Sequence, residues 1–171
     1  MAKVVLKLGD DISTDIIYPG RYMATVLPSE TPQYAFADLP EFNSKLRSGQ
    51  ILPGSVIVAG KNFGCGSSRE QAASTLKGYD LIVVAKNFAR IFMQNAINLG
   101  LRLVVCPEIE AEEGDELEIL ADKIINKTSD KEFTVEPLPK ARQAIIDAGG
   151  LIPYTRLRLL SIKGKKKKGR A

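Results

Sequence analysis

The sequence contains no histidine. Histidine is the side chain that most often acts as a general base or as a metal ligand near neutral pH. Its absence excludes every mechanism that depends on a Ser–His–Asp or Cys–His arrangement. If the chain takes part in catalysis, proton transfer must use another group, or catalytic residues must come from a partner.

Cysteine is scarce as well, with Cys65 and Cys106 the two examples. Their spacing matches no zinc or iron–sulfur ligand pattern. A [4Fe–4S] cluster needs about three or four thiolates, so we expect this chain to bind no cluster and no metal by itself. A disulfide between the two stays open, but two reduced thiols are favoured because the chain carries no export signal.

Long apolar runs are also missing. No run approaches the roughly 20 residues that a membrane span needs. Residues 1–8 hold no apolar segment followed by a cleavage site. We therefore expect a cytoplasmic protein with no membrane contact. The length of 171 residues suits one domain, which we place at 1–162.

Residues 163–171 form a basic tail, which we expect to be disordered. The tail carries six positive charges in a chain of net charge +4, so the body is left at −2. The run Lys165 to Lys168 suggests a nucleic-acid-binding protein as one alternative. No aromatic residues are interleaved with these lysines and the body is acidic, so we expect no nucleic-acid partner.

The pattern of apolar residues predicts an α/β fold. After a short strand at 4–8 and one or two helices within 31–47, strands alternate with helices at 55–59, 68–77, 80–85, 88–99 and 101–106. This alternation predicts parallel strands with right-handed crossovers. Short strands at 115–120, 123–126 and 132–135 are expected to form a smaller layer, and a helix follows at 139–148.

The segment 60–70, GKNFGCGSSRE, follows a predicted strand and opens a predicted helix. Gly64 and Gly66, like the glycine that starts the segment, allow a positive φ and a close approach of the backbone to a ligand. Ser67 and Ser68 then lie near a helix N-terminus, which favours an anion.

Arg69 adds a guanidinium suited to a carboxylate. The segment therefore predicts a binding site for an anionic substrate, with a serine at the centre of the site. The alternative is a plain glycine-rich turn in which a serine caps the helix. The segment fits neither a phosphate-binding loop nor a hydrolase nucleophile motif.

Three stretches of the chain resemble the small, swivelling domain of the aconitase superfamily. The most specific is NFGCGSSREQA at 62–72, and GDDISTDIIYPGRY at 9–22 and KNFARIFMQNAINLG at 86–100 agree with it in the family's order. Together they span most of residues 9–106. The resemblance implies a layered β/β/α swivelling domain.

The resemblance also implies a hydro-lyase that isomerises a hydroxy-acid by dehydration and rehydration. The [4Fe–4S] cluster is then expected on a large partner subunit, without which this chain is inactive. Ser67 matches the serine base, while Ser68 and Arg69 match residues that bind a substrate carboxylate. A serine anion needs amides and a nearby cation to stabilise it, and the start of a helix beside Arg69 offers both.

The loop Arg21 to Thr25 aligns with the family loop that sets substrate choice. Relatives that act on a substrate with an extra carboxylate place an arginine where this chain has Ala24. Tyr22, Met23 and Ala24 suit a branched alkyl group, which favours 3-isopropylmalate over homoaconitate or citrate. Arg21 would restore the charge if it turned inward, and 2,3-dimethylmalate also stays open.

Four further positions are expected to support the site, namely Asp15, Asn62, Gly64 and Gly66. Cys65 is interpreted as a packing residue. A free-standing small-molecule binding domain without catalysis is the remaining alternative. Self-association of the isolated chain is left open.

Overall fold

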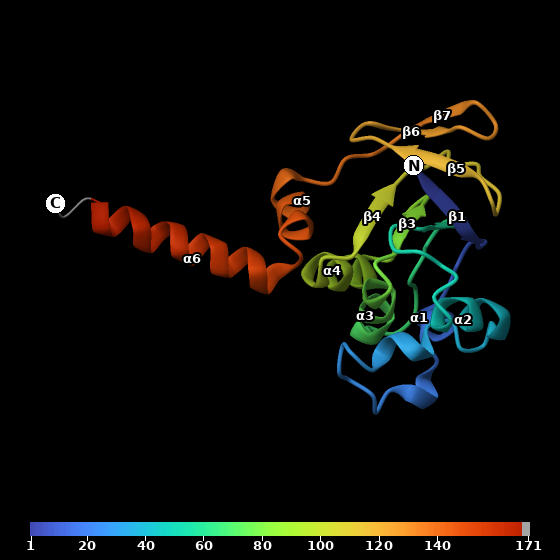
Figure 1. The fold of residues 1–171 in the computed structure, drawn as a ribbon, viewed down its shortest axis with the longest axis horizontal. Coiled ribbons are helices and arrows are strands. Elements are labelled where there is room, and N and C mark those ends of the chain that lie inside the picture. Colours follow the sequence, from blue (N-terminus) through green and yellow to red (C-terminus); the bar gives the residue numbers. More distant parts are fainter. Residues whose placement is uncertain (169–171) are drawn as a thin grey trace.

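Seven strands form one mixed sheet in the computed structural model, within the described residues 1–168 (Figure 1). Side chains are described as far as Ile162. Across the sheet the strand order is β4-β3-β2-β1-β5-β6-β7. The strand bounds are β1 Ala2–Lys7, β2 Val56–Ala59, β3 Ile82–Ala85, β4 Arg102–Val105, β5 Glu116–Ile119, β6 Lys123–Asn126 and β7 Lys131–Thr134.

The parallel half of the sheet contains β2 to β4, which the sequence predicts to be parallel, together with β1. All four residues of β2 and of β3 are buried, as expected for strands covered on both faces. The strands are in register from Val56 opposite Ile82 to Ala59 opposite Ala85. Helix α3 (Glu70–Gly78) links β2 to β3, and helix α4 (Arg90–Leu99) links β3 to β4. The predicted alternation of strands and helices is confirmed.

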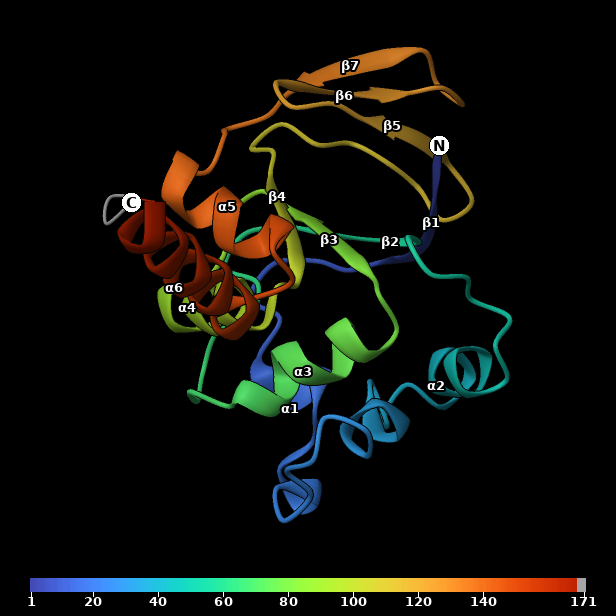
Figure 2. The same cartoon turned by 60° about the vertical axis from the view of Figure 1, so that its left-hand side comes forward.

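Two apolar cores place this half-sheet in the middle of three layers. Val83 packs on the helical side with Leu76 of α3 and Phe92 of α4. The next residue, Val84, points to the other face, where it belongs to a core with Leu117 of β5. The antiparallel strands β5, β6 and β7 therefore lie over the parallel half on the side opposite the helices (Figures 1 and 2). The layered β/β/α arrangement is confirmed.

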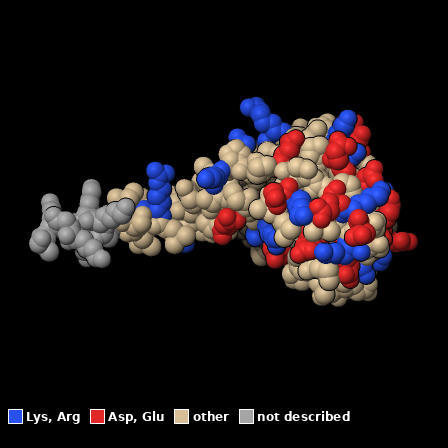
Figure 3. Space-filling model, turned by 90° about the horizontal axis from the view of Figure 1, so that it is seen from above, with Lys and Arg blue, Asp and Glu red and all other residues tan. Residues whose placement is uncertain are grey.

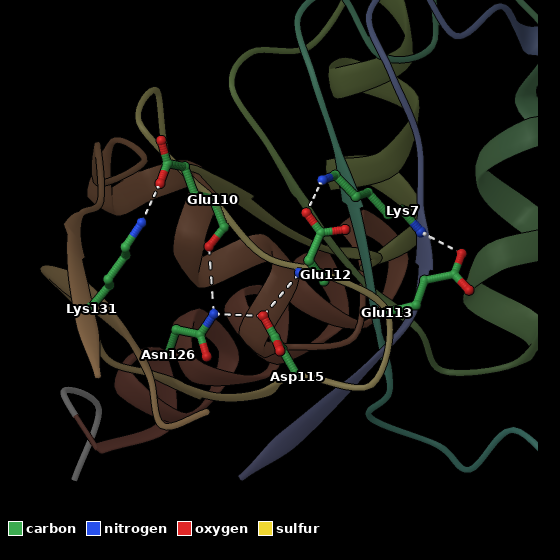
Figure 4. A network of polar contacts seen from close by, with 7 residues as sticks. All are labelled: Lys7, Glu110, Glu112, Glu113, Asp115, Asn126 and Lys131. Atoms are coloured by element: carbon green, nitrogen blue, oxygen red, sulfur yellow. Dashed lines mark hydrogen bonds and ion pairs between the residues drawn. The ribbon is translucent and has the colours of Figure 1, made fainter. Parts of the chain in front are cut away.

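Polar contacts tie the antiparallel layer to the rest of the sheet (Figure 4). The backbone N–H of Lys7 on β1 donates to Glu113 at 3.1 Å, and the Lys7 ammonium pairs with Glu112. Asp115 accepts from the Glu112 N–H at 2.9 Å and from the side-chain amide of buried Asn126 at 2.7 Å. Because both donors favour the charged form, the pKa of Asp115 lies below its usual value, with the Glu112 amide the larger cause.

Residues 9–20 are rich in Asp, Ser, Thr and Gly, which predicts a loop, but the structure corrects this. The stretch contains helix α1 (Thr14–Ile17), and the 3₁₀ turn η1 (Gly20–Tyr22) follows. Helix α1 begins there because the hydroxyl of Ser13 accepts from the N–H of Ile16 at 3.3 Å. The 3₁₀ turn η2 (Thr31–Tyr34) and helix α2 (Pro40–Arg47) follow, which agrees with the second of the two predicted possibilities, one helix or two short ones within 31–47.

Helix α3 begins two residues later than predicted. Its N-cap is Arg69, an extended residue at φ −68° and ψ 112° whose side chain makes no capping hydrogen bond. No serine of the turn therefore caps α3, contrary to the alternative of a plain turn with a serine cap. Helix α4 ends where predicted, because Gly100 adopts the left-handed conformation at φ 74°.

The chain closes with helix α5 (Lys140–Asp147) and helix α6 (Leu151–Lys168). Helix α6 was not predicted, and it projects away from the body (Figures 1 and 3). Several of its large apolar side chains are exposed, namely Leu151, Ile152, Leu157, Leu159, Leu160 and Ile162. Side chains from 163 on lie outside the described part, so the domain boundary at 162 and the disorder of the tail stay predictions. Among the described residues, no helix is long and apolar enough to cross a membrane.

Candidate active site

Two segments far apart in the sequence lie side by side at the site. The stretch that enters α1 runs parallel to the turn that precedes α3, with Ser13 paired to Cys65. The N–H of Gly64 donates to the carbonyl of Ile12 at 2.7 Å, and the N–H of Thr14 donates to the carbonyl of Cys65 at 2.8 Å. The backbone therefore holds the turn that carries the serine pair against the start of α1.

Gly64 and Gly66 both adopt a positive φ, at 82° and 93°. A Cβ at Gly64 would lie 2.2 Å from Cγ of Phe92 on α4, so this position needs glycine for packing as well as for its backbone. A Cβ at Gly66 would meet nothing closer than the Thr14 hydroxyl, at 3.6 Å. The two glycines thus shape the turn, and Gly64 lets α4 approach it directly.

Asn62 joins the site turn to two neighbouring loops. Its backbone N–H donates to the side chain of Asn87 at 2.6 Å, and its side-chain amide donates to Asp11 at 2.7 Å. Asn62 also has a positive φ of 58°, which asparagine tolerates better than most residues. These contacts give Asn62 a role in holding the loops together.

Ser67 lies at the surface directly above a buried threonine. Its Oγ is 3.1 Å from the Oγ1 of Thr14, and that same Oγ1 is 3.1 Å from the Ser67 carbonyl oxygen. Ser67 and Ser68 are exposed, whereas Thr14 is 1% exposed. The sequence interpretation did not single out Thr14. Its position in the recognised stretch at 9–22, one residue before Asp15, was the available signal.

Arg69 is anchored by α1 and the residue that follows it. Its guanidinium pairs with Asp15 and donates to the carbonyl of Tyr18 at 3.2 Å. The side chain is 13% exposed, and its Nε is buried without a hydrogen-bond partner among the described residues. Asp15, which is more exposed, therefore serves as the counter-ion that orients Arg69 beside the serine pair.

The predicted specificity loop packs against an aromatic cluster. The Tyr22 ring stacks on Tyr34 at 4.1 Å between centroids, and Tyr18 donates its hydroxyl to the Tyr22 carbonyl at 3.1 Å. The side-chain amide of Gln71 donates to the carbonyl of Met23 at 3.4 Å, which ties the loop to the first turn of α3. The loop is thereby held next to the helix that begins just after Ser67.

Met23 and Ala24 present their side chains to solvent, with Met23 48% exposed. Arg21 is already engaged, because its guanidinium donates to Asp38 at 3.1 Å and also lies 4.7 Å from the centre of the Tyr22 ring. These Arg21 contacts hold the pKa of Asp38 below its usual value. The positive charge of Arg21 is thus paired with the carboxylate of Asp38, which lies outside the loop at 21–25. Arg21 therefore does not turn inward to add a charge to the apolar part of the loop.

Cys65 and Cys106 are both free thiols, as the sequence interpretation favoured over a disulfide between them. Cys106 is buried, its thiol donates to the carbonyl of Thr134 at 3.3 Å, and burial raises its pKa to about 11. A thiol with so high a pKa is a poor metal ligand. Within the described residues, no group of three or more ligating side chains could hold a metal ion.

A cavity of about 660 Å³ lies elsewhere. It is lined by residues of β4, the β5–β6 turn and α5, such as Val104, Leu120 and Ile146. No residue of the predicted site is among its described lining residues. Ser67, Ser68, Met23 and Ala24 are exposed at the surface of this chain.

Comparison with known proteins gives consistent results. A sequence model of the aconitase C-terminal domain matches residues 17–108. The 3-isopropylmalate dehydratase small subunit 1 of Archaeoglobus fulgidus is 44% identical over 155 residues, which cover 88% of this chain and 93% of that protein. The 3-isopropylmalate dehydratase small subunit of Caldicellulosiruptor bescii is 47% identical over 170 residues, covering 95% and 94%.

A solved structure has the same fold. The crystal structure of 3-isopropylmalate dehydratase (leuD) from Methanocaldococcus jannaschii superposes with a TM-score of 0.86 at 40% sequence identity. The superposition covers 96% of this chain and 97% of that one.

Proposed function

The chain belongs to the aconitase C-terminal domain family, among relatives named 3-isopropylmalate dehydratase small subunit, and from that premise we propose that it contributes the proton-transfer half of a hydro-lyase site. The reaction is the interconversion of 2-isopropylmalate and 3-isopropylmalate by dehydration and rehydration, a step of leucine biosynthesis. The chain works with a large subunit, as the words "small subunit" in its relatives' names imply.

The observation that carries the proposal is the exposed hydroxyl of Ser67 on a rigidly held turn. Its Oγ lies 3.1 Å from the hydroxyl of buried Thr14, and Arg69 and the first amides of α3, which have no acceptors within the helix, follow within three residues of the chain. Such donors stabilise an oxygen anion, because they are already oriented before charge develops. We assign Ser67 the role of base in its alkoxide form.

The [4Fe–4S] cluster expected on the large subunit would act as a Lewis acid toward the substrate hydroxyl and carboxylate. In the dehydration step, the Ser67 oxygen takes the proton from the carbon next to a carboxylate. The electron pair of that C–H bond becomes the second bond of the alkene as the hydroxyl departs with its own pair. In rehydration, Ser67 returns a proton to carbon.

Ser68 and Arg69 are assigned to the substrate carboxylate. Arg69 is fixed in place by Asp15, and its side chain is 13% exposed. A substrate carboxylate that reached the guanidinium would accept a charge-assisted hydrogen bond, which is among the stronger polar contacts. The Asp15 pair sets the orientation of the guanidinium before the substrate arrives.

The apolar loop supports the choice of substrate. Met23 and Ala24 are exposed on a loop tied to the start of α3, and the charge of Arg21 is neutralised by Asp38. A branched alkyl group fits such a loop better than a third carboxylate does. The enzymes of homoaconitate and of 2,3-dimethylmalate are the alternatives within the same reaction class.

The test is reconstitution. We expect the purified chain to bind no iron–sulfur cluster and to turn over nothing alone, and to gain activity when a cluster-bearing large subunit is added. A panel of 3-isopropylmalate, homoaconitate and 2,3-dimethylmalate then ranks the substrates by kcat/KM. A cluster absorbance near 400 nm from this chain alone would contradict the division of labour, and equal inactivity with and without the large subunit would favour a non-catalytic binding domain.

A cytoplasmic location stays part of the proposal, as do the absence of a nucleic-acid partner and the possible self-association of the isolated chain. Deleting residues 163–171 tests the role of the basic tail. Dehydratase activity of the reconstituted enzyme should survive the deletion. Retention of RNA or DNA that the deletion abolishes, in a chain without dehydratase activity, would instead favour the nucleic-acid alternative.

A further inference from the structure

The hydroxyl of Thr14 contacts two atoms of one residue. Its Oγ1 lies 3.1 Å from the Ser67 carbonyl oxygen and 3.1 Å from the Ser67 Oγ. A hydroxyl has one hydrogen to donate and two lone pairs with which to accept. Thr14 can therefore donate to the carbonyl while it accepts from a neutral Ser67, or donate to Oγ, but it cannot donate to both.

The surrounding backbone leaves Thr14 little other freedom. Its N–H donates to the Cys65 carbonyl at 2.8 Å, and its carbonyl accepts from the Tyr18 N–H at 2.8 Å. Its side chain is 1% exposed, beneath a turn that Gly66 bends with a φ of 93°. Rotation about the Cβ–Oγ1 bond is thus the motion that remains open to the hydroxyl hydrogen.

Resting on the proposed role of Ser67 as base, we propose that Thr14 is a positioning residue whose hydroxyl switches its hydrogen bond from the Ser67 carbonyl to the Ser67 Oγ when the serine becomes an alkoxide. The serine proton leaves to solvent water, and Thr14 keeps its own proton throughout. A hydrogen bond donated to the charged form of a group favours that form. Thr14 therefore lowers the pKa of the base and fixes the direction in which its free lone pairs point.

Other ionisable groups lie on the elements that neighbour this serine in the chain or pack against its turn. Asp15 on α1 and Arg69 before α3 pair with each other, so their charges largely cancel. Glu70 begins α3 and Arg90 begins α4, and the Cys65 thiol lies in the same turn as the serine. A change confined to the Thr14 hydroxyl leaves all five of these groups in place.

The matched pair Thr14→Ser and Thr14→Ala isolates the hydroxyl, because both variants lose the γ-methyl and differ by one oxygen. In the complex with the large subunit, Thr14→Ser should stay within about threefold of the wild-type kcat. Thr14→Ala should lose about 10- to 100-fold in kcat with KM little changed, the range expected for a hydrogen bond to a charged group. The acid limb of its pH–rate profile should move to higher pH, because the base then needs a higher pH to lose its proton.

Thr31→Val is the control for losing a buried threonine hydroxyl elsewhere. Thr31 is 0% exposed and its Oγ1 lies 3.1 Å from the Oγ of Ser74, away from the site turn. This variant should keep the wild-type pH profile, whatever it loses in melting temperature. An isosteric Thr14→Val should behave as Thr14→Ala does.

Two results would overturn the inference. Equal kcat values and unshifted pH profiles for Thr14→Ser and Thr14→Ala would show that the hydroxyl plays no part. Equal losses in both variants would show that the methyl group, and hence packing, is what matters. A Ser67→Ala complex that keeps its activity would reject the proposed base itself, so that failure is distinguishable from a failure of the Thr14 step.

Discussion

Replacing Gly64 with alanine should destabilise the turn that carries Ser67, by an amount that follows from the structure. Gly64 has a φ of 82°, and a left-handed conformation costs an L-residue about 1–2 kcal/mol. The new Cβ would lie 2.2 Å from Cγ of Phe92, a side chain that is 2% exposed and packs edge-on against Phe63 at 5.2 Å. Because Phe92 has no space to move into, overpacking adds about 1–3 kcal/mol. The expected total is therefore about 2–5 kcal/mol.

Gly54→Ala is the matched control. Gly54 has nearly the same φ, 80°, but nothing lies within 4 Å of its hypothetical Cβ. Its replacement should cost only the backbone part, about 1–2 kcal/mol. At about 2–4 °C per kcal/mol for a chain of this size, thermal unfolding should show a fall of about 4–20 °C for Gly64→Ala and about 2–8 °C for Gly54→Ala. Equal falls would refute the argument that α4 packs directly on the site turn.

The remaining predictions concern specificity, pH and thiol reactivity. Ala24→Arg should lower the turnover of 3-isopropylmalate and raise that of a substrate with an additional carboxylate, so that the ratio of their kcat/KM values changes by about 10²-fold. An unchanged ratio would mean that the loop at 21–25 does not contact the variable group of the substrate. Asp115→Ala should lower the free energy of unfolding near neutral pH, as measured by urea denaturation. Because the folded-state pKa of Asp115 is depressed, that difference should be present above about pH 4 and fade as the pH falls further, and a constant difference would argue against the Glu112 and Asn126 contacts. Cys106 should react with a thiol reagent at pH 8 only after unfolding, because burial raises its pKa to about 11.

The sequence predicted well where one local pattern decides the structure. The buried runs at 56–59 and 82–85 could hardly form anything but central parallel strands, and Gly100 ended α4 as expected. The serine turn was found because its glycines, serines and arginine are adjacent in the sequence. In each case the information lies within about ten residues.

Contacts between segments that are far apart in the sequence could not be predicted from the sequence. Thr14 and Ser67 are 53 residues apart, and only the pairing of the segment before α1 with the site turn brings their hydroxyls together. The engagement of Arg21 by Asp38 likewise depends on how the loop at 21–25 packs against the aromatic cluster. Helix α6 was missed because its apolar residues are spread around the helix and give no one-sided pattern.

The central claim is that Ser67 moves the substrate proton, and exchange of that proton with solvent tests it most directly. The complex with the large subunit would be incubated with 3-isopropylmalate in deuterated water, and deuterium at the carbon next to the carboxylate would be followed by NMR. Ser67→Ala should reduce the exchange rate by at least about 10²-fold while substrate still binds. The exposed Ser44→Ala on α2 should leave that rate unchanged. Exchange above about a tenth of the wild-type rate in a folded, associated Ser67→Ala complex would contradict the account.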